Sequence, residues 1–148
     1  LEFLEKHFGK SGNFYYNVVR GIHNSEVKSD RITKSVAAEH TFEVNLSSEI
    51  FMMEQLEKIA TSLEKRLKKH HIAGKTVTLK IKYSDFTQQT RSKTLPYFIS
   101  DKGLILETVK ELLFQERMKD SVRLLGISLS NLNTEEKKTV VVQLKFAF

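Results

Sequence analysis

The stretch Lys75–Tyr83, with the sequence KTVTLKIKY, decides the fold. Apolar and polar residues alternate along it one by one, and this period of two is typical of a β-strand with one buried face. We expect Val77, Leu79 and Ile81 to point into a hydrophobic core. The opposite face then carries threonine and lysine side chains, and such a face requires water or a polar partner.

Similar patterns on either side predict three more strands and two helices. The strands are 34–44, 87–95 and 122–129, of which the second is unusually polar and ends before Pro96 at an edge or a turn. A long helix begins after Ser47 or Ser48 and a second one after Asp101, because these side chains can cap a helix N-terminus. The positions predicted to face the core are Val36, Ala38, Phe42 and Val44 in the first strand, Ile50, Met53, Leu56, Ala60, Leu63 and Leu67 in the long helix, Leu104 or Ile105, Val109, Leu112 and Leu113 in the second helix, and Leu125, Ile127 and Leu129 in the last strand.

The order strand, helix, strand, strand, helix, strand predicts an α+β fold. Two β-α-β units of this kind form a four-stranded antiparallel sheet with both helices on one face. The other face of the sheet is then left uncovered by this part of the chain. It is expected to present threonine, lysine and serine rather than large apolar side chains.

The chain divides into four segments by composition and periodicity. Residues 1–20 are predicted to form two short helices around the turn Gly9–Gly12, and 21–33 are a polar linker without periodicity. Residues 34–132 are the sheet domain, and 133–148 are a C-terminal tail. The helical segment is too small to bury its own apolar face, and the chain begins at Leu1 rather than at methionine. We therefore expect the chain to be a fragment of a longer protein.

Composition and charge narrow the classes of function. The net charge is +6, but residues 65–93 alone hold nine basic side chains and one acidic one. Such a basic region suggests a polyanionic partner, and nucleic acid is the first candidate. The alternative is a solvated basic face without a partner. No apolar run of about 18 residues is present, which excludes a membrane-spanning helix. The absence of cysteine excludes disulfides and thiol chemistry and fits a cytoplasmic protein.

Motifs for catalysis are absent from the sequence. It contains no P-loop, no nucleophile elbow, no dinucleotide-binding glycine fingerprint and no zinc-protease helix motif. His70 and His71 are adjacent on a helix and cannot chelate one metal ion together. No strand offers a pair of carboxylates for two-metal chemistry. We therefore expect this chain by itself to be non-catalytic and to hold no metal or cofactor.

Three segments together resemble a known family. They are RITKSV at 31–36, the stretch 75–86 with QTRSKTL at 89–95, and SVRLLGISLS at 121–130. In this order and spacing they resemble the C-terminal little finger domain of Y-family translesion DNA polymerases (the impB/mucB/samB family), within which the bacterial DNA polymerase IV branch is most similar. The segments FGKSG at 8–12 and VRGI at 19–22 resemble the end of that family's thumb.

The resemblance implies a DNA-binding domain whose open sheet face lies along the major groove and holds both backbones. The implied partner is primer–template DNA, damaged or undamaged. The implied contact residues are Lys34, Ser35, Thr90, Arg91, Ser92, Lys93, Thr94, Arg123, Ser128 and Ser130. Arg91, Lys93 and Arg123 are expected to supply positive charge to the phosphates. For Arg123 the alternative is a structural role, as an arginine that packs on a helix or lies on the surface without binding DNA. Lys80 and Lys82 either bind phosphates as well or serve to prevent the strand from pairing with the edge of another sheet. With about five or six charges on phosphates, the log–log salt slope would be about −4 to −5.

The family's catalytic apparatus is not matched by this chain. The resemblance implies that the parent protein is a DNA-directed DNA polymerase of the bacterial cytoplasm, with magnesium bound in a palm domain outside this chain. An alternative of a different class is a stand-alone α+β module that binds nucleic acid or protein. The polar sheet face carries no ladder of aromatic residues, which disfavours binding of splayed single-stranded RNA.

The C-terminal residues QLKFAF resemble the short peptides with which bacterial DNA polymerases bind the sliding clamp (its beta subunit). The implied anchors are Gln143, Leu144, Phe146 and Phe148. A peptide of this type inserts apolar side chains into pockets while the glutamine makes polar contacts. The alternation of apolar residues over 139–148 also allows a fifth strand of the sheet.

Overall fold

The computed structural model describes residues 1–134 of the 148. They form two units, Leu1–Arg31 and a larger unit that begins at Ile32. In the first, α1 (Glu2–Phe8) and α2 (Ser11–Val18) pair around Gly9, as expected, and neither helix buries a large apolar side chain. Residues 22–34 contain no helix or strand. The tail residues Gln143, Leu144, Phe146 and Phe148 lie outside the described residues.

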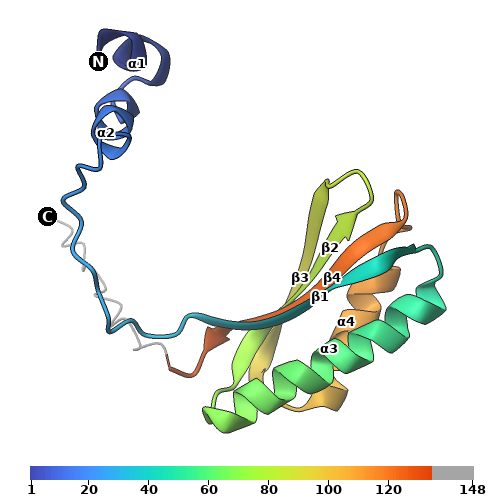
Figure 1. The fold of residues 1–148 in the computed structure, drawn as a ribbon. Coiled ribbons are helices and arrows are strands. Elements are labelled where there is room, and N and C mark those ends of the chain that lie inside the picture. The colour runs from blue at the N-terminus through green and yellow to red at the C-terminus, as the bar shows by residue number, and fades with distance from the viewer. Residues whose placement is uncertain (135–148) are drawn as a thin grey trace, which may run out of the picture. The chain divides into compact units, whose positions relative to one another are not determined.

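The second unit confirms the predicted α+β architecture. Its elements are β1 (Ser35–Leu46), α3 (Glu49–Lys69), β2 (Gly74–Tyr83), β3 (Gln88–Ile99), α4 (Lys102–Phe114) and β4 (Val122–Leu132). The four strands form one antiparallel sheet in the order β1-β4-β2-β3. Both helices lie on the same side of it (Figure 1). Each β-α-β unit is split, because β4 lies between β1 and β2, and β2 lies between β3 and β4.

The core lies between this sheet and the two helices. Val77, Leu79 and Ile81 of β2 are opposite Leu129, Ile127 and Leu125 of β4, and all six are buried, as their alternation predicts. From α3 and α4 the core receives a set of buried side chains on one face of each helix. They are Met52, Leu56, Ile59, Ala60, Leu63, Leu67, Ile105, Val109, Leu112 and Leu113.

Two predicted core positions are wrong. Ile50 is 72% exposed and Met52 is buried instead, because Met52 lies one turn before Leu56 on the same helix face, whereas Ile50 is six residues away. Val44 is 78% exposed. The pairing of β1 with β4 shifts between Thr41 and Leu46, and such an irregularity breaks the alternation on which the prediction relied.

The ends of the elements follow from their caps and from their place in the sheet. The Asp101 carboxylate accepts a hydrogen bond from the Leu104 N–H at 3.2 Å, which confirms the predicted cap of α4. Ser48 occupies the N-cap position of α3 without a side-chain bond. β3 continues through Pro96 to Ile99, beyond its predicted end. It is an edge strand, where a missing N–H is tolerated.

Candidate nucleic-acid interface

The face of the sheet opposite the helices, called here the open face, is composed of four rows of residues that run across the strands. The strand register places them in the order β1, β4, β2, β3. The rows are Ser35, Ser130, Thr76 and Thr94; Ala37, Ser128, Thr78 and Ser92; Glu39, Gly126, Lys80 and Thr90; and Thr41, Leu124, Lys82 and Gln88. Six of the ten contact residues named from the sequence lie on this face. They are Ser35, Thr90, Ser92, Thr94, Ser128 and Ser130.

Hydroxyl groups dominate one half of the open face. Thr76 Oγ1 and Thr94 Oγ1 are 2.9 Å apart, and Thr78 Oγ1 and Ser92 Oγ are 2.8 Å apart. Each hydroxyl has one donor and two acceptor sites, so these cross-strand bonds leave capacity for a further partner. This half is therefore an ordered surface of neutral hydrogen-bonding groups.

The other half of the open face carries charge, part of which is already neutralised. Lys80 Nζ on β2 is 2.8 Å from Glu39 Oε2 on β1, so the ion pair crosses β4 above Gly126. A Cβ at Gly126 would lie 3.0 Å from the Glu39 Cβ and 3.5 Å from the Lys80 Cβ. The glycine thus leaves the space in which these two side chains meet.

A second group of charges lies at the end of the open face next to the β2–β3 turn. The register between β2 and β4 shifts there, from Lys82 opposite Leu124 to Tyr83 opposite Val122, so Arg123 is an extra residue in β4. The Arg123 guanidinium carbon lies 4.8 Å from the centroid of the Phe86 ring, and Lys82 Nζ lies 5.4 Å from it. Within the described part of the chain, neither cation has a carboxylate within ion-pair distance.

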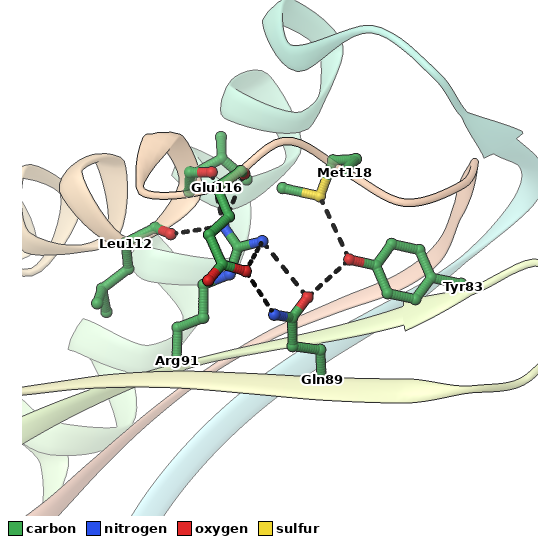
Figure 2. Close-up of polar contacts among 7 residues, drawn as sticks. Tyr83, Gln89, Arg91, Leu112, Glu116 and Met118 are labelled. Carbon is green, nitrogen blue, oxygen red and sulfur yellow. Dashed lines mark hydrogen bonds and ion pairs between the residues drawn. The ribbon is translucent and has the colours of Figure 1, made fainter.

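Arg91 does not lie on the open face. The residue is 6% exposed, and Nη1 donates to the carbonyl oxygens of Leu112 and Leu113, both at 2.8 Å, and of Glu116 at 3.1 Å (Figure 2). The guanidinium therefore neutralises the negative C-terminal end of α4. This corrects the expectation that Arg91 is available to DNA phosphates, because its charge is buried and already bonded.

A small polar network surrounds the Arg91 side chain. The Gln89 side-chain oxygen accepts from the Tyr83 hydroxyl at 2.8 Å and from Arg91 Nη2 at 3.4 Å, while Gln89 Nε2 donates to Glu116 at 3.2 Å (Figure 2). The Tyr83 hydroxyl also lies 3.9 Å from Met118 Sδ. The network ties β2 and β3 to the segment that follows α4.

Lys93 and Lys34 also lie outside the four rows. Lys93 is opposite the buried Val77, so it is on the helix-facing side of β3, and it forms an ion pair with Glu111 of α4. The hydrogen bond with Glu111 raises the pKa of the Lys93 ammonium group. Lys34 is exposed and directly precedes β1.

Some open-face residues were not named as contacts from the sequence. Thr76 and Thr78 belong to them, although their outward direction follows from the alternation in Lys75–Tyr83. Gln88 is another, and Phe86 lies beside this face in the β2–β3 turn. No periodicity marks these two residues, because Gln88 begins a polar edge strand and Phe86 belongs to a turn. Within residues 1–134, no group of three or more histidine and carboxylate side chains could hold a metal ion. None of the helices described there is long and apolar enough to cross a membrane.

Comparisons with known proteins agree with this geometry. The model of the impB/mucB/samB family C-terminal domain matches residues 33–146. DNA polymerase IV 2 of Agrobacterium fabrum is 42% identical over 138 residues, which cover 93% of this chain and 39% of that protein. DNA polymerase IV of Bacteroides fragilis is 39% identical over 150 residues, which cover 99% of this chain and 41% of that protein.

A solved structure shows the same fold. It is described as a complex of the beta-clamp processivity factor and the little finger domain of PolIV. The match has a TM-score of 0.59 at 23% identity, and it covers 74% of this chain and 99% of the solved chain. The chain spans about two fifths of the length of the curated relatives that it matches. It belongs to the impB/mucB/samB family, and residues 33–146 are the C-terminal domain of that family.

Proposed function

We propose that this domain holds primer–template DNA, damaged or undamaged, by its sugar–phosphate backbone. The observation that carries the proposal is that hydroxyl and cationic side chains from all four strands lie on a face that neither α3 nor α4 covers. The relatives named DNA polymerase IV act on DNA by their name, and the domain shares its fold with a polymerase little finger.

The chemistry of the open face suits contacts that do not depend on sequence. Threonine and serine hydroxyls donate to phosphate oxygens, and lysine and arginine supply charge, but such contacts carry no information about the bases. The four rows contain no aromatic ring on which an unpaired base could stack. The face is therefore suited to a duplex of any sequence, as a polymerase requires.

The parent protein is, in this proposal, a DNA polymerase IV-like enzyme of the bacterial cytoplasm that synthesises DNA across lesions. Its nucleotide-transfer chemistry and its magnesium ions belong to a palm domain outside this chain. Within the described residues Glu39 and Glu111 form ion pairs with lysines, and no group of three or more histidine and carboxylate side chains could hold a metal ion. The domain would contribute binding and positioning of DNA, and the palm would contribute catalysis.

Binding of the chain to duplex DNA is expected to weaken steeply with salt and to be the same for duplexes of different sequence. The three cations proposed to meet phosphates are Lys34, Lys82 and Arg123, because Arg91 is buried, Lys93 faces α4 and Lys80 is paired with Glu39. Three contacts predict a slope of log affinity against log salt of about −3. Fluorescence anisotropy over a salt series measures this slope. A slope near zero, or strong preference for one sequence, would contradict the proposal.

We also propose that the C-terminal tail tethers the polymerase to the sliding clamp through Gln143, Leu144, Phe146 and Phe148. Two observations support this: the resemblance of these residues to clamp-binding peptides, and the presence of a beta clamp in the solved complex of the similar domain. A peptide with alternating apolar residues can insert them into pockets of a partner.

Removal of residues 143–148 is expected to abolish binding to the clamp without changing duplex affinity or thermal stability. Surface plasmon resonance with immobilised clamp measures the first, and a melting curve measures the last. The substitution Lys145→Ala, which keeps all four anchors, serves as the matched control and should bind like the parent. A truncated chain that melts well below the parent would favour the alternative, in which the tail is a fifth strand.

A further inference from the structure

The geometry points to a phosphate-binding subsite at the end of the open face, formed by Lys82 and Arg123 and held in place by the exposed ring of Phe86. The inference rests on the proposed function, because the phosphate is taken to belong to the DNA backbone. It assigns to Phe86 a role in positioning two cations, which the sequence alone did not suggest.

The backbone at Phe86 is the first observation. The turn between β2 and β3 is closed by a bond from the Phe86 N–H to the Tyr83 carbonyl at 3.0 Å and by one from the Tyr83 N–H to the Thr87 carbonyl at 2.9 Å. Phe86 has φ of 68°, in the left-handed region. That region disfavours residues with a bulky side chain and is usually occupied by glycine or asparagine. A glycine would therefore suit this backbone better than phenylalanine does.

Core packing does not explain why phenylalanine is present. The Phe86 side chain is 61% exposed and does not belong to the hydrophobic core. Two cations lie beside it, with the Arg123 guanidinium 4.8 Å and Lys82 Nζ 5.4 Å from the ring centroid. An aromatic face attracts cations at such distances and orders their long side chains. Two positive charges from different strands thus lie within 5.4 Å of the centroid of one ring.

The charge balance of this place favours an anion. Lys80, the neighbouring cation on β2, is already paired with Glu39, whereas no carboxylate in residues 1–134 forms an ion pair with Lys82 or Arg123. Asp85, the acid of the turn itself, is engaged elsewhere. Its carboxylate accepts from the Thr87 hydroxyl at 2.6 Å and from the Thr87 N–H at 2.9 Å, and these bonds lower the pKa of Asp85.

A phosphate is the anion that suits Lys82 and Arg123 together. Two like charges near one ring repel each other, and a shared anion removes that repulsion. Arginine binds phosphate through two parallel N–H groups, and lysine adds a point charge. Because the ring already orders both side chains, less conformational entropy is lost when the phosphate binds. The subsite would fix one backbone phosphate at the rim of the open face.

The substitution Phe86→Gly tests the inference because its effects on stability and on binding have opposite signs. The net charge and both cations remain, so long-range attraction of DNA is unchanged. Melting temperature should equal or exceed that of the parent, because glycine suits the left-handed backbone. Duplex affinity should fall about three- to tenfold, and the salt slope should become shallower by about one, because the cations are no longer held together.

Three further variants complete the anisotropy experiment. Phe86→Leu keeps an apolar side chain without a ring and should lose affinity like Phe86→Gly. Phe86→Tyr keeps the ring and should bind like the parent, as should Phe114→Ala, which removes an exposed aromatic from α4. If Phe86→Gly binds as tightly as a parent that shows the expected salt slope, the subsite is wrong and the proposed function stands. If the affinity of the parent does not depend on salt, the proposed function is wrong, and the subsite that rests on it is wrong as well.

Discussion

Replacing Arg91 with methionine is expected to lower the free energy of unfolding by about 3 kcal/mol and to leave the DNA affinity of the folded protein unchanged. The guanidinium of Arg91 is buried and bonds three carbonyl oxygens at the C-terminal end of α4. Methionine fills similar volume but leaves those carbonyls without their donor. Hydrogen bonds to charged groups contribute about 1.5–3 kcal/mol each, and the loss of several is only partly offset by water.

Urea denaturation of the parent and the variant measures the change in stability, and anisotropy below the transition measures DNA affinity. Lys93→Met is the matched control on the same strand, because it removes an exposed ion pair with Glu111 and should destabilise much less. Arg91→Lys keeps the charge but not the forked donor and should be intermediate. If Arg91→Met folded as stably as the parent and bound DNA far more weakly, Arg91 would be a DNA ligand after all.

The double substitution Lys82→Ala/Arg123→Ala is expected to weaken duplex binding about 10- to 100-fold at moderate salt. The salt slope should become shallower by about two, because each side chain is proposed to neutralise one phosphate. In the described residues neither cation is paired with a carboxylate, so little intramolecular stabilisation is lost with them. Anisotropy over the same salt series measures both quantities, and the melting temperature should change little.

A control for net charge is available on the helices. Lys65 of α3 and Lys110 of α4 are exposed, and both helices lie on the side of the sheet opposite the open face. Their double replacement by alanine removes the same two charges and should have a much smaller effect on affinity and slope. Equal effects of the two double variants would mean that DNA responds to net charge and not to the open face.

The alternation in Lys75–Tyr83 and in 122–129 is sufficient to predict that Val77, Leu79 and Ile81 of β2 and Leu125, Ile127 and Leu129 of β4 face the helices. The same reasoning could not orient β3, whose residues 88–94 are polar on both sides. Its register with β2, which is visible only in the structure, places Thr90, Ser92 and Thr94 on the open face and Arg91 and Lys93 beneath it. An arginine that reaches the end of a helix 21 residues later depends on the packing of that helix.

Arg123 is a second residue whose position the sequence pattern could not predict. Strict alternation would place it on the same side as the buried Leu125, but the shift in pairing beside Tyr83 makes it an extra residue in β4. Its guanidinium then reaches Phe86, whose own position depends on a left-handed turn residue. Neither the shift nor the turn conformation leaves a periodic signal in the sequence, so the cluster of Lys82, Phe86 and Arg123 emerges only from the structure.

Threonine methyl groups offer the most direct test of the claim that the open face binds the DNA backbone. The threonines on that face are Thr41, Thr76, Thr78, Thr90 and Thr94, whereas Thr61 and Thr108 lie in α3 and α4. The measurement is a titration of the chain, carrying labelled threonine methyls, with duplex DNA by NMR spectroscopy. The five open-face resonances should shift on binding, and those of Thr61 and Thr108 should stay in place. Shifts confined to Thr61 and Thr108 would contradict the account.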